Sequence, residues 1–143
     1  MNGWQRYADL LVYRALDSLL KGSRLRAEEL FRELMSMWGS YGLKDAAFKS
    51  TYATYKLALA VYLYRALEVA GSDMVYECRD SMSEICESLS KLQRSDGSMV
   101  TDYIVPDGYI VPSGDANVET TSMVVLALYS NYPETIERLA RRA

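Results

Sequence analysis

The 143-residue chain contains no histidine, and this absence excludes several kinds of catalytic site. Ser-His-Asp hydrolysis, Cys-His proteolysis, HExxH zinc binding and proton transfer through imidazole all need that side chain. Cysteine is scarce as well, since Cys78 and Cys86 are its only two copies. On one helix this spacing separates them by about 12 Å, which is too far for a disulfide. Two thiols without a nearby histidine also make a poor zinc site, so we predict neither a metal nor a cofactor.

The chain also lacks long apolar runs and a strong net charge. Its longest apolar run covers residues 57–64, whereas a membrane-spanning helix needs about 20 apolar residues. The N-terminus lacks the basic and then apolar pattern of a signal peptide. We therefore expect a cytoplasmic protein that does not enter a membrane. The net charge of −3 argues against attraction of the whole chain to nucleic acid.

What the sequence has in abundance is helical periodicity. Six helices are expected, at residues 7–21, 24–38, 51–70, 74–92, 120–129 and in a polar segment after Pro133. The third and fifth segments are apolar on nearly all sides, which is typical of a helix packed by several neighbours. The second and fourth segments carry a single apolar face, which is typical of a helix at the surface.

Inner and outer helices thus alternate along the chain, and short matches recur between the inner ones. Tyr-Arg-Ala-Leu occurs at 13–16 and 64–67, and Leu-Ala-Leu occurs at 57–59 and 126–128. We therefore predict an all-α fold of three antiparallel helical hairpins that form one domain. The hairpins cover about residues 4–38, 51–92 and 119–143, and an acidic loop covers residues 93–118.

The acidic loop contains the most β-like sequence of the chain. Residues 103–105 and 109–111 flank the turn sequence Pro-Asp-Gly, which predicts a small β-hairpin within the loop. Over residues 93–119, five acidic side chains stand against Arg94 alone, a net charge of −4. A compact domain usually keeps so long a loop for a functional or capping role.

The loop and the segments around it resemble the repeat unit of the α/α-toroid superfamily, which includes terpenoid cyclases, protein prenyltransferase β subunits and complement-type thioester domains. The matching residues are Leu89, Leu92, Gln93, Asp96-Gly97-Ser98, Gly114-Asp115, Glu119-Thr120-Thr121 and Leu126-Ala127-Leu128. The resemblance implies an arc of helical hairpins, about half of a complete toroid. It implies none of the family's chemistries, because the acid-rich cyclase motif, the zinc-binding histidine and the Cys-Gly-Glu-Gln segment are all missing here.

Three acidic residues are the candidate catalytic groups, namely Asp102, Asp115 and Glu119. If the hairpin folds over the start of the last inner helix, these carboxylates converge and could act as general acid and base on a glycan. They could equally bind Ca²⁺ through their oxygen atoms. The alternative is purely structural, because Asp115 or Asn117 can cap the helix and Glu119 suits the positive end of its dipole.

The twelve tyrosines suggest an aromatic groove for a sugar or an isoprenoid. The candidate ligand-binding residues are Tyr52, Tyr55, Tyr103 and Tyr109. The alternative is that these rings fill the core while their hydroxyl groups reach the surface.

Our leading hypothesis from the sequence is a non-catalytic binding or assembly module. The alternative is an enzyme that acts on a glycan or another neutral ligand, with Glu119 and Asp115 as acid and base. An open arc of helices exposes apolar flanks, so we also expect a homo-oligomer or a larger toroid partner, and no binding to nucleic acid or membranes. A third possibility is a structural remnant of a longer toroid enzyme.

Overall fold

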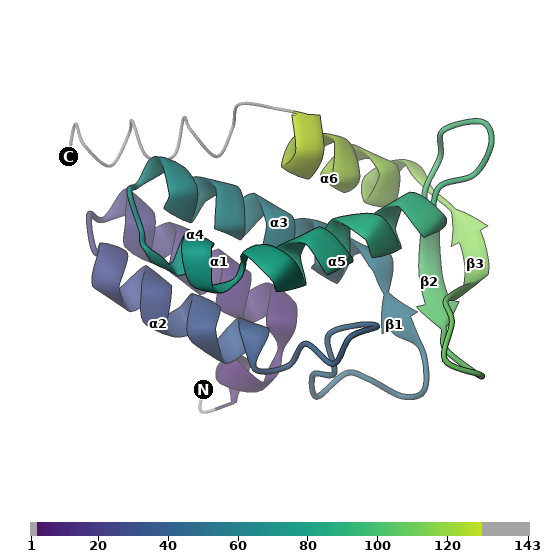
Figure 1. Ribbon diagram of the computed structural model, residues 1–143, viewed down its shortest axis with the longest axis horizontal. Coiled ribbons are helices and arrows are strands. Elements are labelled where there is room, and N and C mark those ends of the chain that lie inside the picture. The colour runs from purple at the N-terminus through teal and green to yellow at the C-terminus, as the bar shows by residue number, and fades with distance from the viewer. Residues whose placement is uncertain (1–2, 130–143) are drawn as a thin grey trace.

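The structure is a computed structural model that describes residues 3–129 of the chain (Figure 1). Its helices are η1 (Trp4–Arg6), α1 (Ala8–Leu20), α2 (Arg24–Met35), α3 (Thr54–Val69), α4 (Met74–Glu77), α5 (Arg79–Lys91) and α6 (Val118–Tyr129). Its strands are β1 (Tyr52–Ala53), β2 (Val100–Ile104) and β3 (Val111–Ala116). The polar helix expected after Pro133, and with it the outer half of the third hairpin, lies outside the described residues.

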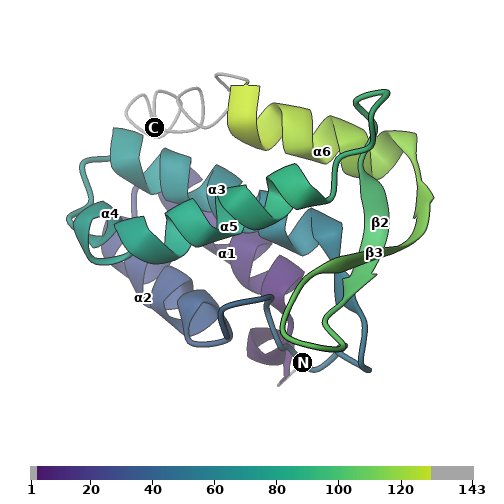
Figure 2. The ribbon, with the colours of Figure 1, turned by 45° about the vertical axis from the view of Figure 1, so that its right-hand side comes forward.

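The helix α3 forms the centre of the fold. It contacts α1, α2, α4, α5 and α6, and Figure 2 shows it between α6 and α1. Its buried side chains occur on all sides of the helix and include Leu57, Leu59, Val61 and Leu63. The prediction of a helix packed by several neighbours is therefore confirmed, and burial of its apolar surface stabilises the fold.

The other described helices follow the sequence pattern closely except over residues 74–92. Helix α1 ends before Gly22, whose φ of 78° favours glycine, and α2 follows at once. Residues 74–92 do not form one helix, because the chain leaves helical geometry at Cys78 between α4 and α5. At this break the Tyr64 hydroxyl donates to the Val75 carbonyl (2.9 Å), an acceptor that the next helical turn would otherwise use.

The prediction of an all-α fold is wrong, because a three-stranded antiparallel sheet in the order β1-β2-β3 completes the structure. Strands β2 and β3 form a hairpin around Pro-Asp-Gly as expected, but they cover residues 100–104 and 111–116 instead of 103–105 and 109–111. Strand β1 was expected to be the start of a helix, but Tyr52 pairs with Tyr103 and Ala53 pairs with Asp102. The two tyrosine rings stack in the core with centroids 5.1 Å apart. This long-range packing overrides the local helical pattern at residues 52–53.

The loop between α2 and β1 packs closely on the sheet. The Tyr103 hydroxyl donates to the carbonyl of Tyr41 at 2.7 Å. A side chain at Gly42 would overlap the ring of Tyr52 and the hydroxyl of Tyr103, so only glycine permits this approach.

Within residues 3–129, no helix is both long enough and apolar enough to cross a membrane.

Candidate functional site

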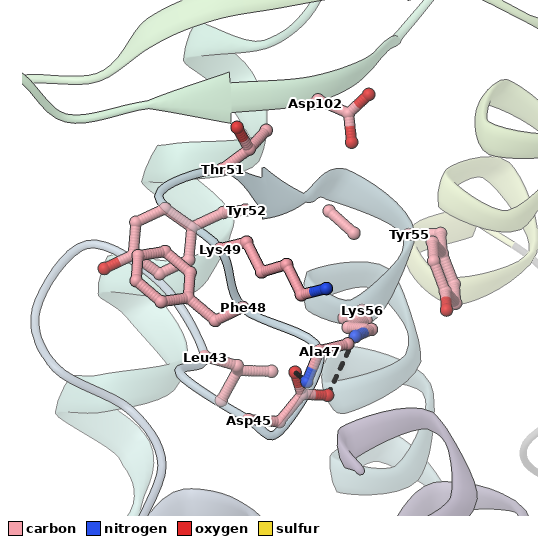
Figure 3. A pocket seen from close by; sticks show the side chains of 11 residues that line it. Leu43, Asp45, Ala47, Phe48, Lys49, Thr51, Tyr52, Tyr55, Lys56 and Asp102 are labelled. Atoms are coloured by element: carbon pink, nitrogen blue, oxygen red, sulfur yellow. Dashed lines mark hydrogen bonds and ion pairs between the residues drawn. The ribbon is translucent and has the colours of Figure 1, made fainter.

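Two adjoining cavities lie at the N-terminal end of α3. The first, of about 370 Å³, lies between the loop before β1, strand β1 itself and the start of α3 (Figure 3). The second, of about 390 Å³, extends toward the start of α6. Both cavities are lined by Ala53, Tyr55 and Asp102, so they border one another along these residues. We name the two cavities together the Tyr55 groove.

The floor of the groove is an ion pair between Asp45 and Lys56. Lys56 Nζ donates to Asp45 Oδ2 at 2.8 Å, and the backbone N–H of Ala8 donates to the same oxygen at 2.8 Å. The backbone N–H of Ala47 donates to Asp45 Oδ1 at 3.0 Å. The Asp45 side chain is fully buried and that of Lys56 is 10% exposed. Asp45 therefore satisfies a first-turn N–H of α1 and also neutralises a buried lysine.

The aromatic wall of the groove is Tyr55. Its hydroxyl donates to Asp9 Oδ2 at 3.0 Å, which holds the ring in place between the two cavities. Burial, followed by the hydrogen bond and negative charge of Asp9, raises the pKa of the Tyr55 phenol well above its ordinary value. Tyr55 therefore remains a neutral hydrogen-bond donor at physiological pH. Lys56 Nζ lies over one face of its ring, 6.0 Å from the ring centroid.

The rim of the groove carries polar groups whose hydrogen-bonding capacity is only partly used. The Thr101 hydroxyl donates to Asp102 Oδ2 at 2.9 Å, and within residues 3–129 no group donates to Asp102 Oδ1. The Glu119 carboxylate and the Lys49 ammonium make no ion pair or hydrogen bond with another described residue. In Figure 3, Lys49 extends across the first cavity below Asp102.

The structure brings two of the three predicted carboxylates together. Asp102 and Glu119 both line the second cavity, together with Asn117. Asp115 lines neither cavity, because its side chain projects into solvent from β3, and its ion pair with Arg94 is long at 4.0 Å. The helix cap comes from Asn117, whose Oδ1 accepts the backbone N–H of Thr120 at 2.8 Å.

The four predicted tyrosines have different environments. Tyr55 lines both cavities, as described above. Tyr52 borders the first cavity but is only 7% exposed, because its ring packs between Phe48 and Tyr103. Tyr103 is fully buried, whereas Tyr109 is 60% exposed and lines neither cavity. Tyr55 is therefore the member of this group that is best placed to contact a ligand.

The sequence patterns do not identify Asp45, Lys49 or Phe48 as part of a site. The sequence contains one indication of the buried ion pair at the floor, because Lys56 interrupts a segment that is otherwise apolar. A lysine at such a position needs a buried anionic partner. Nothing in the local sequence identifies Asp45 as that partner, because it lies in an irregular segment eleven residues earlier.

The described residues offer no cluster of metal ligands. Within residues 3–129, no group of three or more cysteine, aspartate or glutamate side chains is placed to hold a metal ion. Calcium binding by the loop carboxylates therefore has no support from this part of the chain. Burial raises the pKa of both thiols, Cys78 and Cys86, so both favour the protonated form.

Comparison with known proteins does not place the chain in a family. No protein-family model matches it, and no solved structure gives a significant match. The interpretation of the Tyr55 groove therefore depends on its own geometry.

Proposed function

We propose that the chain is a non-catalytic binding module and that its ligand is a small polar molecule held in the Tyr55 groove. The observation that carries this proposal is the contrast within the groove. The polar atoms of Asp45 are paired internally, whereas those of Lys49 and Glu119 remain available beside a fixed aromatic ring. A concave surface with a few convergent polar groups is the usual form of a ligand site.

The position of the carboxylates favours binding over catalysis. Glycoside hydrolysis needs two carboxyl groups on either side of one bond. The pair expected for that role, Glu119 and Asp115, does not share a cavity. A glycan-active enzyme remains the alternative, and it would have to use Asp102 in place of Asp115, since Asp102 and Glu119 line the same cavity.

A ligand titration followed by NMR tests the proposal. The backbone amide signals of the ¹⁵N-labelled chain would be recorded against a library of small polar compounds. We expect at least one compound to shift signals of the groove, such as those of Lys49, Ala53 and Glu119. The Asp115→Asn variant is the control and should bind equally well. The proposal fails if no compound shifts these signals, or if the shifts occur elsewhere on the chain.

Self-association is a second candidate function, and the surface of α6 supports it. The sequence of α6 is largely apolar, yet Val118, Val125 and Tyr129 are exposed, at 77%, 48% and 80%. These residues lie at intervals of seven and four and therefore form one ridge. A ridge without charge can pack against a second copy of itself.

Light scattering over a range of concentrations tests self-association. We expect the mean mass to rise with concentration, and the Val125→Glu variant should remain monomeric. Leu25→Glu is the control, because it alters an exposed apolar residue on α2 and should not change the measured mass. A monomeric mass at every concentration would exclude this function.

We also propose that α1, α3 and α6 correspond to the inner helices of an α/α-toroid arc. Contacts of α3 with both α1 and α6, and of α2 and α5 with α3, support this arrangement. For the compartment we propose the cytoplasm, since Cys78 and Cys86 are both free thiols, as is usual in a reducing environment.

A further inference from the structure

The division of the Tyr55 groove into two bordering cavities is its most informative property. Each cavity alone falls near the lower end of the usual range for ligand pockets, which is about 300–1,000 Å³. The border between them is formed by Ala53, Tyr55 and Asp102, and Ala53 has the smallest side chain of the three. A ligand that contacts this border therefore lies against both cavities.

The unpaired charges along the groove are of both signs, so its ligand needs groups that both donate and accept hydrogen bonds. The available cation of the first cavity is Lys49, and the second cavity contains the carboxylate of Glu119. Asp102 lies between them with one carboxylate oxygen unpaired among the described residues. An anion in the groove would meet the two carboxylates, and a cation would meet Lys49. Hydroxyl groups avoid both conflicts, because they accept from ammonium groups and donate to carboxylates.

The ring of Tyr55 supplies an apolar surface at the middle of the groove. The hydroxyl of this residue is fixed by Asp9, so the ring keeps its orientation. Aromatic rings with one fixed polar end suit ligands that have both an apolar face and polar edges. The C–H face of a sugar ring has this character, and its hydroxyl groups project from the edges.

We propose that the ligand is a neutral, linear oligosaccharide of at least two rings that crosses Ala53 and occupies both cavities. One ring contacts Lys49 in the first cavity and the next contacts Glu119 in the second. Asp102 accepts hydrogen bonds from hydroxyl groups near the linkage. This inference rests on the proposed function, because it specifies the ligand of the same groove.

Calorimetric titration with neutral glucose, its α- and β-linked disaccharides and the corresponding trisaccharides tests the inference. We expect at least one disaccharide to bind about tenfold more tightly than glucose, because its second ring gains one or two hydrogen bonds in the second cavity. Lys49→Ala and Glu119→Gln should each lower the affinity for that disaccharide about tenfold.

The Ala53→Phe variant tests the crossing directly. A large side chain at the border should remove the gain from the second ring, so that the disaccharide binds no more tightly than glucose. Ala116→Phe is the matched control, since Ala116 is also a strand alanine but lines neither cavity. Thermal unfolding of both variants shows whether they fold like the original chain, and Ala53→Val provides a milder substitution if Ala53→Phe does not.

The outcomes separate this inference from the proposed function. Equal affinity for glucose and for every longer sugar would overturn the two-ring ligand and leave the groove as a binding site. Failure of every sugar, with another compound still shifting groove signals by NMR, would overturn the oligosaccharide but not the proposed function. If no compound of any class binds in the groove, both are wrong.

Discussion

The floor and the rim of the Tyr55 groove both contain carboxylates, but those of the floor and the rim differ in burial and in hydrogen-bond pairing. On the floor, Asp45 is fully buried and its two oxygen atoms receive three hydrogen bonds. On the rim, Glu119 has no ion-pair partner among the described residues, and Asp102 uses one oxygen only. Burial and pairing therefore distinguish a carboxylate that stabilises the fold from one that is available to bind a ligand.

Removal of the floor carboxylate, Asp45, should have the largest effect on the free energy of unfolding. In Asp45→Ala, the buried Lys56 loses its partner and the N–H of Ala8 loses its acceptor, so we expect a loss of about 3–5 kcal/mol in the free energy of unfolding. Denaturation with urea measures this loss. Asp115→Ala is the control and should change stability by less than about 0.5 kcal/mol. Similar losses in both variants would contradict the distinction between floor and rim.

Removal of the floor lysine should cost less than removal of its partner. Lys56→Met keeps the length of the side chain, and Asp45 still accepts from the N–H groups of Ala8 and Ala47. We expect a loss of about 1–3 kcal/mol, since one hydrogen-bond partner of a buried charge is removed. The same urea experiment measures it. A loss larger than that of Asp45→Ala would show that Lys56, rather than Asp45, organises the floor.

The wall residue should show an intermediate effect. Tyr55→Phe retains the ring but removes the hydrogen bond to Asp9, so we expect a loss of about 1 kcal/mol. Tyr109→Phe is the matched control, because its side chain is exposed and should leave stability unchanged. Calorimetric melting of both variants measures the difference. Equal melting temperatures would mean that the Asp9 contact does not hold the ring.

The rim should show the smallest effect on stability and the largest on binding. For Asp102→Asn and Glu119→Gln we expect stability changes below about 0.5 kcal/mol, since neither carboxylate forms a buried ion pair. Ligand affinity should fall about tenfold in each variant. Urea denaturation and NMR titration on the same samples provide the two measurements. A large loss of stability with unchanged affinity would place these residues with the floor.

Local patterns predicted most helices but not the sheet. The periodicity of α3 depends on residues close together in sequence, and so does the Pro-Asp-Gly turn of the hairpin. Strand β1 depends instead on the packing of Tyr52 against Tyr103, which no local pattern reveals. Local sequence therefore assigns a two-residue strand directly before a regular apolar helix to that helix.

The candidate site could be predicted only in part, for a related reason. Asp102 and Glu119 were identified by their residue type, and the structure places them in one cavity. Asp115 was grouped with them because it is near in sequence, but its side chain projects from β3 into solvent. The register of β3 against β2 shifts between the pairs Asp102–Ser113 and Val100–Ala116, and Asp115 lies in this irregular stretch, which local sequence does not predict.

The pairing of β1 with β2 has a consequence for how the protein folds. It joins two strands about fifty residues apart, so the chain must close a long loop to form it. Contacts between distant residues of this kind slow folding, and we expect the Tyr55 groove to be completed late. A ligand that binds only the completed groove would then act on the folded state alone. Its presence should raise the melting temperature of the whole chain, in proportion to the logarithm of its concentration above the dissociation constant.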